Sequence, residues 1–263
     1  MHWRTVLRFN HEGRTMLVKR LGADTEPQFV LVHGIGVASR YYTRLAAVLA
    51  RSGGVHAVEL PGHGGAPKPA RRQSIEDYAA VLSAYVLEAG LTDPILVGHS
   101  MGGQIVIEAA LQHPDAFRRI VLLGSVVNPR ERSAILQGLR LAQDTFLETI
   151  PSNYAVFRDY ARTGPRWYLA TVPAMIGYRT DEAAALLTAE TLVVRGVRDP
   201  IARHHWSEEL TGLIPRSRLV EVPGGAHVVM YTATDRVARE ILDHARIGVP
   251  ATDSTEPHSG TAA

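Results

Sequence analysis

The stretch Ile95-Leu96-Val97-Gly98-His99-Ser100-Met101-Gly102 decides the fold, because it joins a short apolar run to a segment with helical character. Glycines stand two residues before and two residues after the serine. This spacing fits a sharp strand-to-helix turn that holds Ser100 in a strained backbone conformation and exposes its hydroxyl. The helix over residues 104–111 would direct backbone N–H groups toward an anion formed at the turn. We therefore interpret Ser100 as a candidate nucleophile; the plainer alternative is a tight turn with a surface serine.

The composition is typical of one large α/β domain with an insertion: 263 residues, 46% hydrophobic and 21% charged. No apolar stretch approaches the roughly 20 residues of a membrane helix, so we expect no membrane span. The first ten residues lack the apolar centre and cleavage site of a signal peptide, and we expect a cytoplasmic protein. The absence of cysteine excludes disulfides, a cysteine nucleophile and thiolate metal sites. A net charge of +2, without a basic cluster among aromatics, argues against a nucleic-acid partner.

Short strand-like runs alternate with helical segments along the chain. They cover residues 3–9, 14–20, 29–32, 55–59, 95–97, 120–123, 192–195 and 218–222. The first two runs predict an antiparallel hairpin that turns at residues 10–13. The continuously apolar runs from residue 29 onward predict a parallel sheet buried on both faces. Ser74 with Asp77 predicts a capping-box start for a helix that ends at Gly90.

The strand pattern stops between residues 126 and 187, where helical stretches, prolines and aromatic residues replace it. The aromatic residues are Phe146, Tyr154, Phe157, Tyr160, Trp167, Tyr168 and Tyr178. We expect an inserted helical cap that lies over the strand ends and encloses an apolar cleft, although these aromatics could simply form the cap's own core. Residues 1–125 and 188–247 would then form the main domain. Residues 248–263, rich in Pro, Thr, Ser and Ala, are predicted to be disordered.

A nucleophilic serine needs a general base, which in turn needs a carboxylate to orient it. Asp199 follows the strand-like run 192–195 directly, and His227 follows the run 218–222. The carboxyl ends of parallel strands meet at one edge of the sheet, which is where such a sheet presents its chemistry. We therefore predict Asp199 as the orienting carboxylate, with a turn-capping aspartate as the alternative, and His227 as the base.

The remaining histidines have simpler interpretations. His99 adjoins the serine but should point away from its hydroxyl as a buried packing residue. His63 stands in a loop that we interpret as structural; the alternative is that His63 lines the cleft. His204 and His205 precede an amphipathic helix and are neighbours that cannot share one helical face, so we interpret them as surface residues and expect no metal site.

A tetrahedral intermediate also needs hydrogen-bond donors for its oxygen. One candidate is the backbone N–H of Met101, the residue after the serine. The other is the backbone N–H of Ile35, in the loop His33-Gly34-Ile35-Gly36 that follows the run 29–32. Glycines in that loop let its backbone approach the site.

Together these motifs resemble the α/β-hydrolase superfamily, of the capped single-domain kind. The matching segments are His33–Gly36, Leu60–Gly64, Gly98–Gly103, Gly196–Asp199 and Gly225–His227, and the resemblance spans residues 29–246. It implies an eight-stranded, mostly parallel sheet with helices on both faces, and a triad that needs no cofactor. By this resemblance Ser100 is the nucleophile, His227 the base and then the acid, and Asp199 the orienting residue, while Ile35 and Met101 form the oxyanion hole.

The chain departs from the family pattern at three positions. Glu59 stands where the family usually has an aspartate, before Leu60-Pro-Gly-His-Gly64. Thr232 and Thr234 stand where a glutamate and a proline are common, which puts the start of the last helix in question.

A serine at this turn argues against the epoxide hydrolases and haloalkane dehalogenases, which carry aspartate there. We expect hydrolysis of a carboxylic ester of a medium-sized, largely apolar small molecule through an acyl-enzyme, with Gly34, Trp167 and Tyr168 as candidate substrate contacts. Three alternatives share the fold and triad. Carbon–carbon bond hydrolases typically have asparagine at the position of His99, and cofactor-free perhydrolases have tighter, drier sites. The third alternative is a non-hydrolytic receptor or biosynthetic protein. Neither the substrate nor the oligomeric state follows from the sequence.

Overall fold

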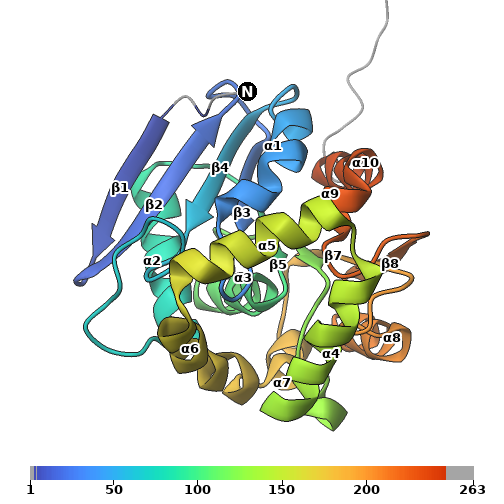
Figure 1. Ribbon diagram of the computed structural model, residues 1–263. Coiled ribbons are helices and arrows are strands. Elements are labelled where there is room, and N and C mark those ends of the chain that lie inside the picture. The colour runs from blue at the N-terminus through green and yellow to red at the C-terminus, as the bar shows by residue number, and fades with distance from the viewer. Residues whose placement is uncertain (1–2, 4, 247–263) are drawn as a thin grey trace, which may run out of the picture.

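The computed structural model describes residue 3 and residues 5–246, and the predicted disordered tail over 248–263 lies outside these residues. Eight strands of the described chain form one sheet in the order β1-β2-β4-β3-β5-β6-β7-β8 (Figure 1). The strands are β1 Thr5–His11, β2 Arg14–Leu21, β3 Gln28–Val32, β4 Gly54–Glu59, β5 Ile95–His99, β6 Arg119–Leu123, β7 Glu190–Gly196 and β8 Ser217–Val222. The pairs β1–β2 and β2–β4 are antiparallel and all others are parallel. The predicted hairpin and the mostly parallel eight-stranded sheet are both confirmed.

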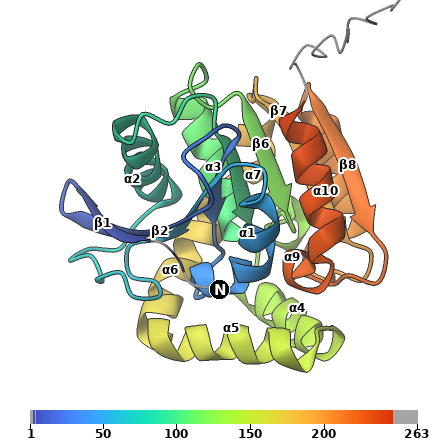
Figure 2. The ribbon, with the colours of Figure 1, turned by 90° about the horizontal axis from the view of Figure 1, so that it is seen from above.

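Helices cover both faces of this sheet, as Figure 2 shows. One face packs against α1 (Thr43–Leu49) and α10 (Thr234–Ala245), and the other against α2 (Ile75–Glu88), α3 (Met101–Gln112) and α8 (His204–Leu213). Side chains alternate between the faces: Phe29 and Leu31 of β3 enter the first core, and Val30 and Val32 enter the second. This double burial explains the continuously apolar strand runs of the sequence.

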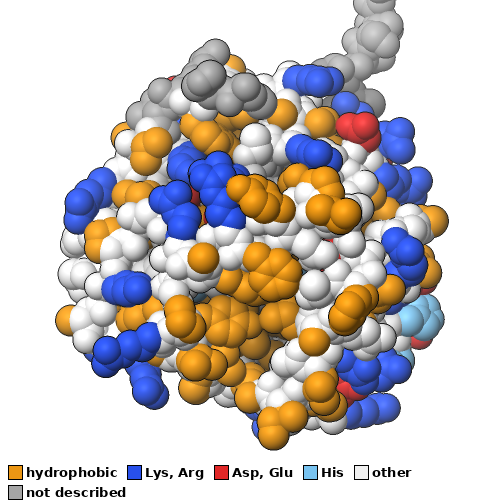
Figure 3. Space-filling view, in the orientation of Figure 1, with side chains coloured by type: hydrophobic (Ala, Val, Ile, Leu, Met, Phe, Trp, Pro, Cys, Tyr) orange, Lys and Arg blue, Asp and Glu red, His pale blue; other side chains and the backbone are white. Residues whose placement is uncertain are grey.

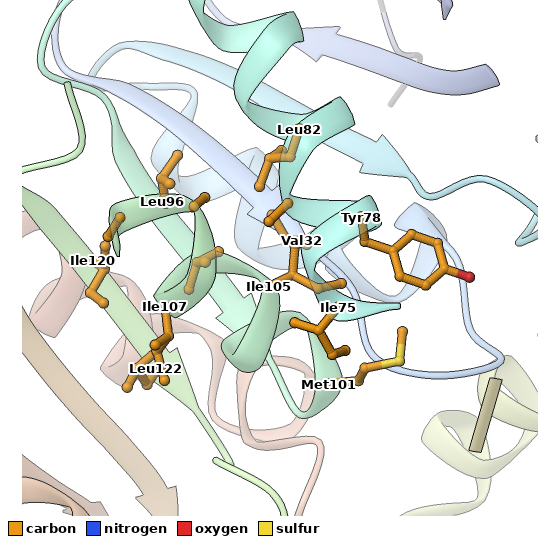
Figure 4. Packing of buried hydrophobic residues seen from close by; sticks show 14 of the residues in the cluster. Val32, Ile75, Tyr78, Leu82, Leu96, Met101, Ile105, Ile107, Ile120 and Leu122 are labelled. Atoms are coloured by element: carbon orange, nitrogen blue, oxygen red, sulfur yellow. The ribbon is translucent and has the colours of Figure 1, made fainter. Parts of the chain in front are cut away.

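The core between α2, α3 and the sheet holds the serine turn in place. Figure 4 shows Leu82 of α2 and Ile105 of α3 over Leu96 and Leu122 of β5 and β6. Each such side chain is wholly or almost wholly buried, and burial of one aliphatic side chain stabilises a fold by about 1.5–3 kcal/mol. The helix that starts from Ser100 is therefore anchored along its length by the main hydrophobic core.

The predicted helix boundaries also hold. The Ser74 hydroxyl accepts a hydrogen bond from the Asp77 N–H (3.2 Å), and the Asp77 carboxylate accepts one from the Ser74 N–H (3.1 Å), which completes the capping box of α2. The last helix begins at Thr234, so the unusual threonines have not prevented a helix start there.

Four helices lie between β6 and β7, and residues 126–187 contain no strand, as predicted. They are α4 (Ala134–Leu147), α5 (Ile150–Thr163), α6 (Pro165–Gly177) and α7 (Thr180–Ala185), preceded by a 3-10 turn at Pro129–Glu131. We refer to residues 129–185 as the helical insertion. Figures 1 and 2 show α4 and α5 as a layer across one end of the strands. A short helix, α9 (Val229–Thr232), follows β8 and precedes α10.

Candidate active site

Ser100 lies in the turn between β5 and α3, with φ 56° and ψ −122°. This left-handed backbone costs about 1–3 kcal/mol for a non-glycine residue and must be imposed by its surroundings. A Cβ atom at residue 98 would overlap the Gly102 carbonyl, and one at residue 102 would overlap the Val32 carbonyl. The Ser100 N–H donates to the Leu123 carbonyl at 2.9 Å, which fixes the turn against β6. Glycines are therefore required on both sides of the serine, as the spacing predicts.

Asp199 and His227 form a buried ion pair behind this turn. The Nδ1 of His227 donates to Oδ2 of Asp199 at 2.9 Å, and the two residues are 5% and 3% exposed. The other carboxylate oxygen, Oδ1, accepts from the N–H groups of Ile201 (2.8 Å) and Ala202 (2.9 Å). Burial alone would raise the pKa of Asp199, but the charge of His227 and these donors lower it. Asp199 thus remains ionised and holds Nε2 of His227 free to exchange protons.

The pKa of His227 is raised in turn. Burial alone would lower it, but the charge and hydrogen bond of Asp199, together with the charges of Asp144 and Glu148, raise the pKa to about 9. These carboxylates therefore stabilise the protonated ring, so a proton taken up by Nε2 is held there, while only the neutral ring can accept one.

Ser100 and His227 line one pocket of about 250 Å³. Gly34, Ile35 and Tyr168, three other predicted site residues, line the same pocket. Asp199 lies behind the imidazole, outside the pocket lining. The geometry therefore brings the predicted hydroxyl, imidazole and carboxylate together at the carboxyl ends of β5, β7 and β8.

The backbone N–H groups of Ile35 and Met101 form no hydrogen bond with any described residue. The loop after β3 approaches the serine closely, since a Cβ on Gly34 would lie 3.0 Å from that of Ser100. Both N–H groups thus lack an acceptor among the described residues, and they belong to the residues that directly follow Ser100 and Gly34.

Trp167 is the one predicted substrate contact that does not line this pocket. Its indole packs against the loop at Gly62, where a Cβ atom would overlap the ring. The pocket face of α6 is formed instead by Tyr168, Val172 and Met175, which follow helical spacing. Trp167 points to a different side of the helix and packs against the loop at Gly62, so its role as a substrate contact stays a prediction that this pocket does not support.

His99 belongs to a hydrogen-bond chain that sequence reasoning missed. The Gly34 N–H donates to the Tyr41 hydroxyl, the hydroxyl contacts His99 Nδ1, and His99 Nε2 contacts the His227 carbonyl, each at 3.0 Å. A carbonyl only accepts, so Nε2 carries the hydrogen and Nδ1 accepts from the tyrosine. Burial lowers the pKa of His99 to about 3, which keeps the ring neutral. Its buried position was predicted, but no local pattern around Tyr41 indicates the link.

The other histidines lie away from this pocket. His63 is buried and its Nδ1 contacts the Pro61 carbonyl at 3.2 Å, while His204 lies at the surface beside Glu208 and Glu221. Within the described ranges, no group of three or more His, Asp or Glu side chains is arranged to hold a metal ion. No helix in that part of the chain combines the length and apolar character needed to cross a membrane.

Glu59, one of the three departures from the family pattern, is held by hydrogen bonds and an ion pair with neighbouring segments. Its carboxylate accepts from the Ser39 hydroxyl (2.8 Å) and the Gly65 N–H (2.8 Å), and pairs with Lys19 (2.7 Å). It ties the loops after β3 and β4 together without lining the pocket.

Comparison with known proteins identifies the family of this chain. Residues 29–240 match the model of the alpha/beta hydrolase family, and the chain belongs to this family.

Haloalkane dehalogenase 2 of Mycobacterium tuberculosis is 26% identical over 252 residues, covering 83% of this chain and 88% of the relative. The uncharacterized protein Rv2715 of the same organism is 32% identical over 103 residues, which cover 39% of this chain and only 30% of that protein. The crystal structure of the esterase RhEst1 from Rhodococcus sp. ECU1013 superposes with a TM-score of 0.78 at 22% identity, covering 92% of this chain and 98% of the other. Together these matches support a hydrolase.

Proposed function

We propose that this chain is a serine hydrolase that cleaves a carboxylic ester of a medium-sized, largely apolar small molecule, with Ser100, His227 and Asp199 as its catalytic triad. One observation carries the proposal: the strained Ser100 shares its pocket with an imidazole that is bound through Nδ1 to a buried carboxylate. A serine hydroxyl is unreactive at neutral pH unless a base removes its proton, and this arrangement supplies that base.

The proposed reaction has two halves. Oγ of Ser100 bonds to the ester carbonyl carbon while its proton passes to Nε2 of His227, and the resulting oxyanion accepts hydrogen bonds from the N–H groups of Ile35 and Met101. His227 then gives that proton to the departing alcohol oxygen as the C–O bond breaks, which leaves an acyl-enzyme. Water repeats the sequence, giving a proton to His227 and its oxygen to the acyl carbon, and Ser100 recovers its proton.

The substrate class rests on the walls of the pocket. Apolar side chains of the helical insertion form much of the lining, among them Leu141, Val156, Phe157, Leu169 and Val172. We propose residues 126–187 as a cap over the core of residues 1–125 and 188–247, which shelters an apolar acyl or alcohol group from water. The reaction of the related haloalkane dehalogenase does not transfer, because Ser100 occupies the nucleophile position in this chain.

The test combines covalent labelling with an ester series. A fluorophosphonate probe should label the purified protein once, at Ser100, and p-nitrophenyl esters from acetate to laurate should be hydrolysed with a preference for intermediate chains. Ser100→Ala should abolish labelling and lower kcat by about 10⁶-fold. Full turnover in that variant would mean a different nucleophile, and a wild-type protein with neither labelling nor turnover would favour the receptor or biosynthetic alternative.

A further inference from the structure

Apart from His227, whose charge is paired with Asp199 behind it, the charged residues that line the pocket are of one sign. Among the residues that line it, Asp144 and Glu148 carry carboxylates and no lysine or arginine is present. Asp144 lies in the last turn of α4 and Glu148 is the C-cap residue directly after the helix, so both stand at the same end of α4. Arginines do occur in the insertion, but Arg140 pairs with Glu131 outside the pocket, and neither Arg158 nor Arg166 lines it.

Both carboxylates contact the loop that carries His227. Oδ1 of Asp144 accepts from the His227 N–H at 3.1 Å, and Oε1 of Glu148 accepts from the Val228 N–H at 2.7 Å. The second oxygen of Glu148 accepts from the Ser152 hydroxyl at 3.0 Å. Within the described residues, no donor contacts Oδ2 of Asp144. Asp144 is only 4% exposed and lines the pocket, so its carboxylate is largely withdrawn from bulk solvent, and one of its oxygens has no donor among the described residues.

Aromatic rings stand in the same pocket as this oxygen. Tyr41, Phe157, Tyr160 and Tyr168 all contribute to the lining. Aromatic faces attract cations, most strongly where water is excluded. Burial raises the pKa of Asp144 to about 6, so the carboxylate still carries its charge at neutral pH. A buried carboxylate in a pocket that is also lined by aromatic rings attracts an ammonium group and repels a carboxylate.

We infer that this pocket selects esters bearing an ammonium group and rejects esters bearing a carboxylate, with Asp144 and Glu148 as the specificity-determining residues. The inference rests on the proposed hydrolase function and narrows its substrate class. It also disfavours any reaction in this pocket on a substrate with a free carboxylate, because no lysine or arginine lines the wall and the charge of His227 is already paired with Asp199.

The experiment uses three p-nitrophenyl esters of matched length, whose acyl chains end in a trimethylammonium, a tert-butyl or a carboxylate group. The first two end groups have nearly the same shape, so their comparison isolates charge. We expect kcat/KM to fall in the order ammonium, tert-butyl, carboxylate, with roughly 100-fold between the extremes at neutral pH. Equal values for the three esters, or a preference for the carboxylate, would overturn the inference while leaving the hydrolase intact.

The double variant Asp144→Asn, Glu148→Gln keeps the shape of both side chains and their carbonyl acceptors toward the His227 loop. In this variant, kcat/KM for the ammonium ester should exceed that for the carboxylate ester by no more than about threefold, because the charges that cause the preference are gone. The control is Glu182→Gln, which removes an exposed carboxylate of α7 outside the pocket and should leave the wild-type ratio unchanged. A double variant that kept the full ratio would contradict the assignment of these two residues.

A binding measurement separates this inference from the proposed function. Isothermal titration with pentyltrimethylammonium and with hexanoate requires no turnover. The wild-type protein should bind the ammonium at least about tenfold more tightly than the carboxylate, and the double variant should lose that difference. If no ester is hydrolysed but this difference is present, the hydrolase proposal fails and the charge selection stands; if the difference is absent, the charge selection fails.

Discussion

The loops at the strand ends and the helical insertion both line the pocket, but they differ in how tightly their residues are packed. Ser100, Asp199 and His227 are almost completely buried, and the backbone around them is held by hydrogen bonds to the core. The insertion exposes large apolar side chains, and Figure 3 shows hydrophobic groups gathered on this face. The exposed large apolar side chains of the insertion are Ile135, Leu139, Phe146, Ile150, Tyr154, Phe157 and Leu169. The proposed reacting groups are thus fixed by the fold, whereas the walls proposed to contact substrate come from helices that are only partly packed.

This difference in packing suggests that the strand-end loops carry the proposed reaction and that the insertion selects the substrate. A nucleophile and its base lose activity when displaced by about 1 Å, so they belong on tightly packed elements. The apolar wall residues of α4, α5 and α6 can change without disturbing that arrangement, because they are on separate elements from the proposed triad. Substitutions should therefore have larger effects at the strand ends than at matched positions of the insertion.

The largest effect is expected from Asp199→Asn. The amide would present its NH2 group or its oxygen to His227 without the negative charge, so the imidazole loses the partner that fixes its tautomer. We expect kcat to fall by about 10⁴-fold with little change in KM, as measured with the best p-nitrophenyl ester. A loss below about tenfold would show that this buried pair is structural and that another group orients the base.

One glycine substitution in the serine turn and one in the helical insertion test how tightly each region is packed. Gly102→Ala would drive a Cβ atom into the Val32 carbonyl, and backbone cannot move away easily, so we expect a loss of at least about 3 kcal/mol in the free energy of unfolding. Gly138→Ala, in the middle of α4, meets no atom within 4 Å and should raise the free energy of unfolding by about 0.5–1 kcal/mol. Urea denaturation measures both. Equal destabilisation would mean that the insertion is packed as tightly as the core.

The pH dependence of kcat/KM tests the electrostatics of the strand-end loops. In the proposed mechanism only neutral His227 can accept the proton of Ser100, and its pKa of about 9 lies above neutrality. The groups that face this imidazole are Asp199 from the loop after β7, Asp144 of α4 with the C-cap residue Glu148, and the neutral His99 from β5. Activity should rise about tenfold per pH unit toward pH 9 and then level off. The double variant Asp144→Asn, Glu148→Gln removes two of these charges and should move the profile to lower pH.

The Ser100→Ala protein supplies the blank for this profile, because p-nitrophenyl esters hydrolyse on their own at alkaline pH. A profile already flat between about pH 6 and 9 would mean that the free imidazole is neutral at pH 7 and that the raised pKa does not govern the reaction.

Local patterns in the sequence were sufficient for the fold and for the residues at the strand ends. Gly98 and Gly102 follow from the geometry of one turn, and Asp199 and His227 follow from their places directly after strands. Trp167 and Tyr168 are adjacent aromatic residues, and only the rotation of α6 against its neighbours decides which faces the pocket. The Tyr41 link and the position of Asp144 depend on contacts between segments 58 and 83 residues apart, which no local pattern encodes.

The smallest effect is expected from Tyr41→Phe, which removes one hydroxyl from the chain that joins the loop of Gly34 to the carbonyl of His227. The Gly34 N–H and His99 Nδ1 would each lose a partner in a buried setting, where an unsatisfied group costs about 1–3 kcal/mol. We expect kcat to fall about tenfold, because the loop that carries the proposed oxyanion donor Ile35 is no longer fixed against the His227 loop. Tyr154→Phe removes the same hydroxyl from an exposed residue of α5 and should leave kcat unchanged. If Tyr41→Phe lowered stability but left kcat intact, the chain would serve folding alone, and the placement of the two loops would have to depend on Glu59 and the backbone hydrogen bonds of the sheet.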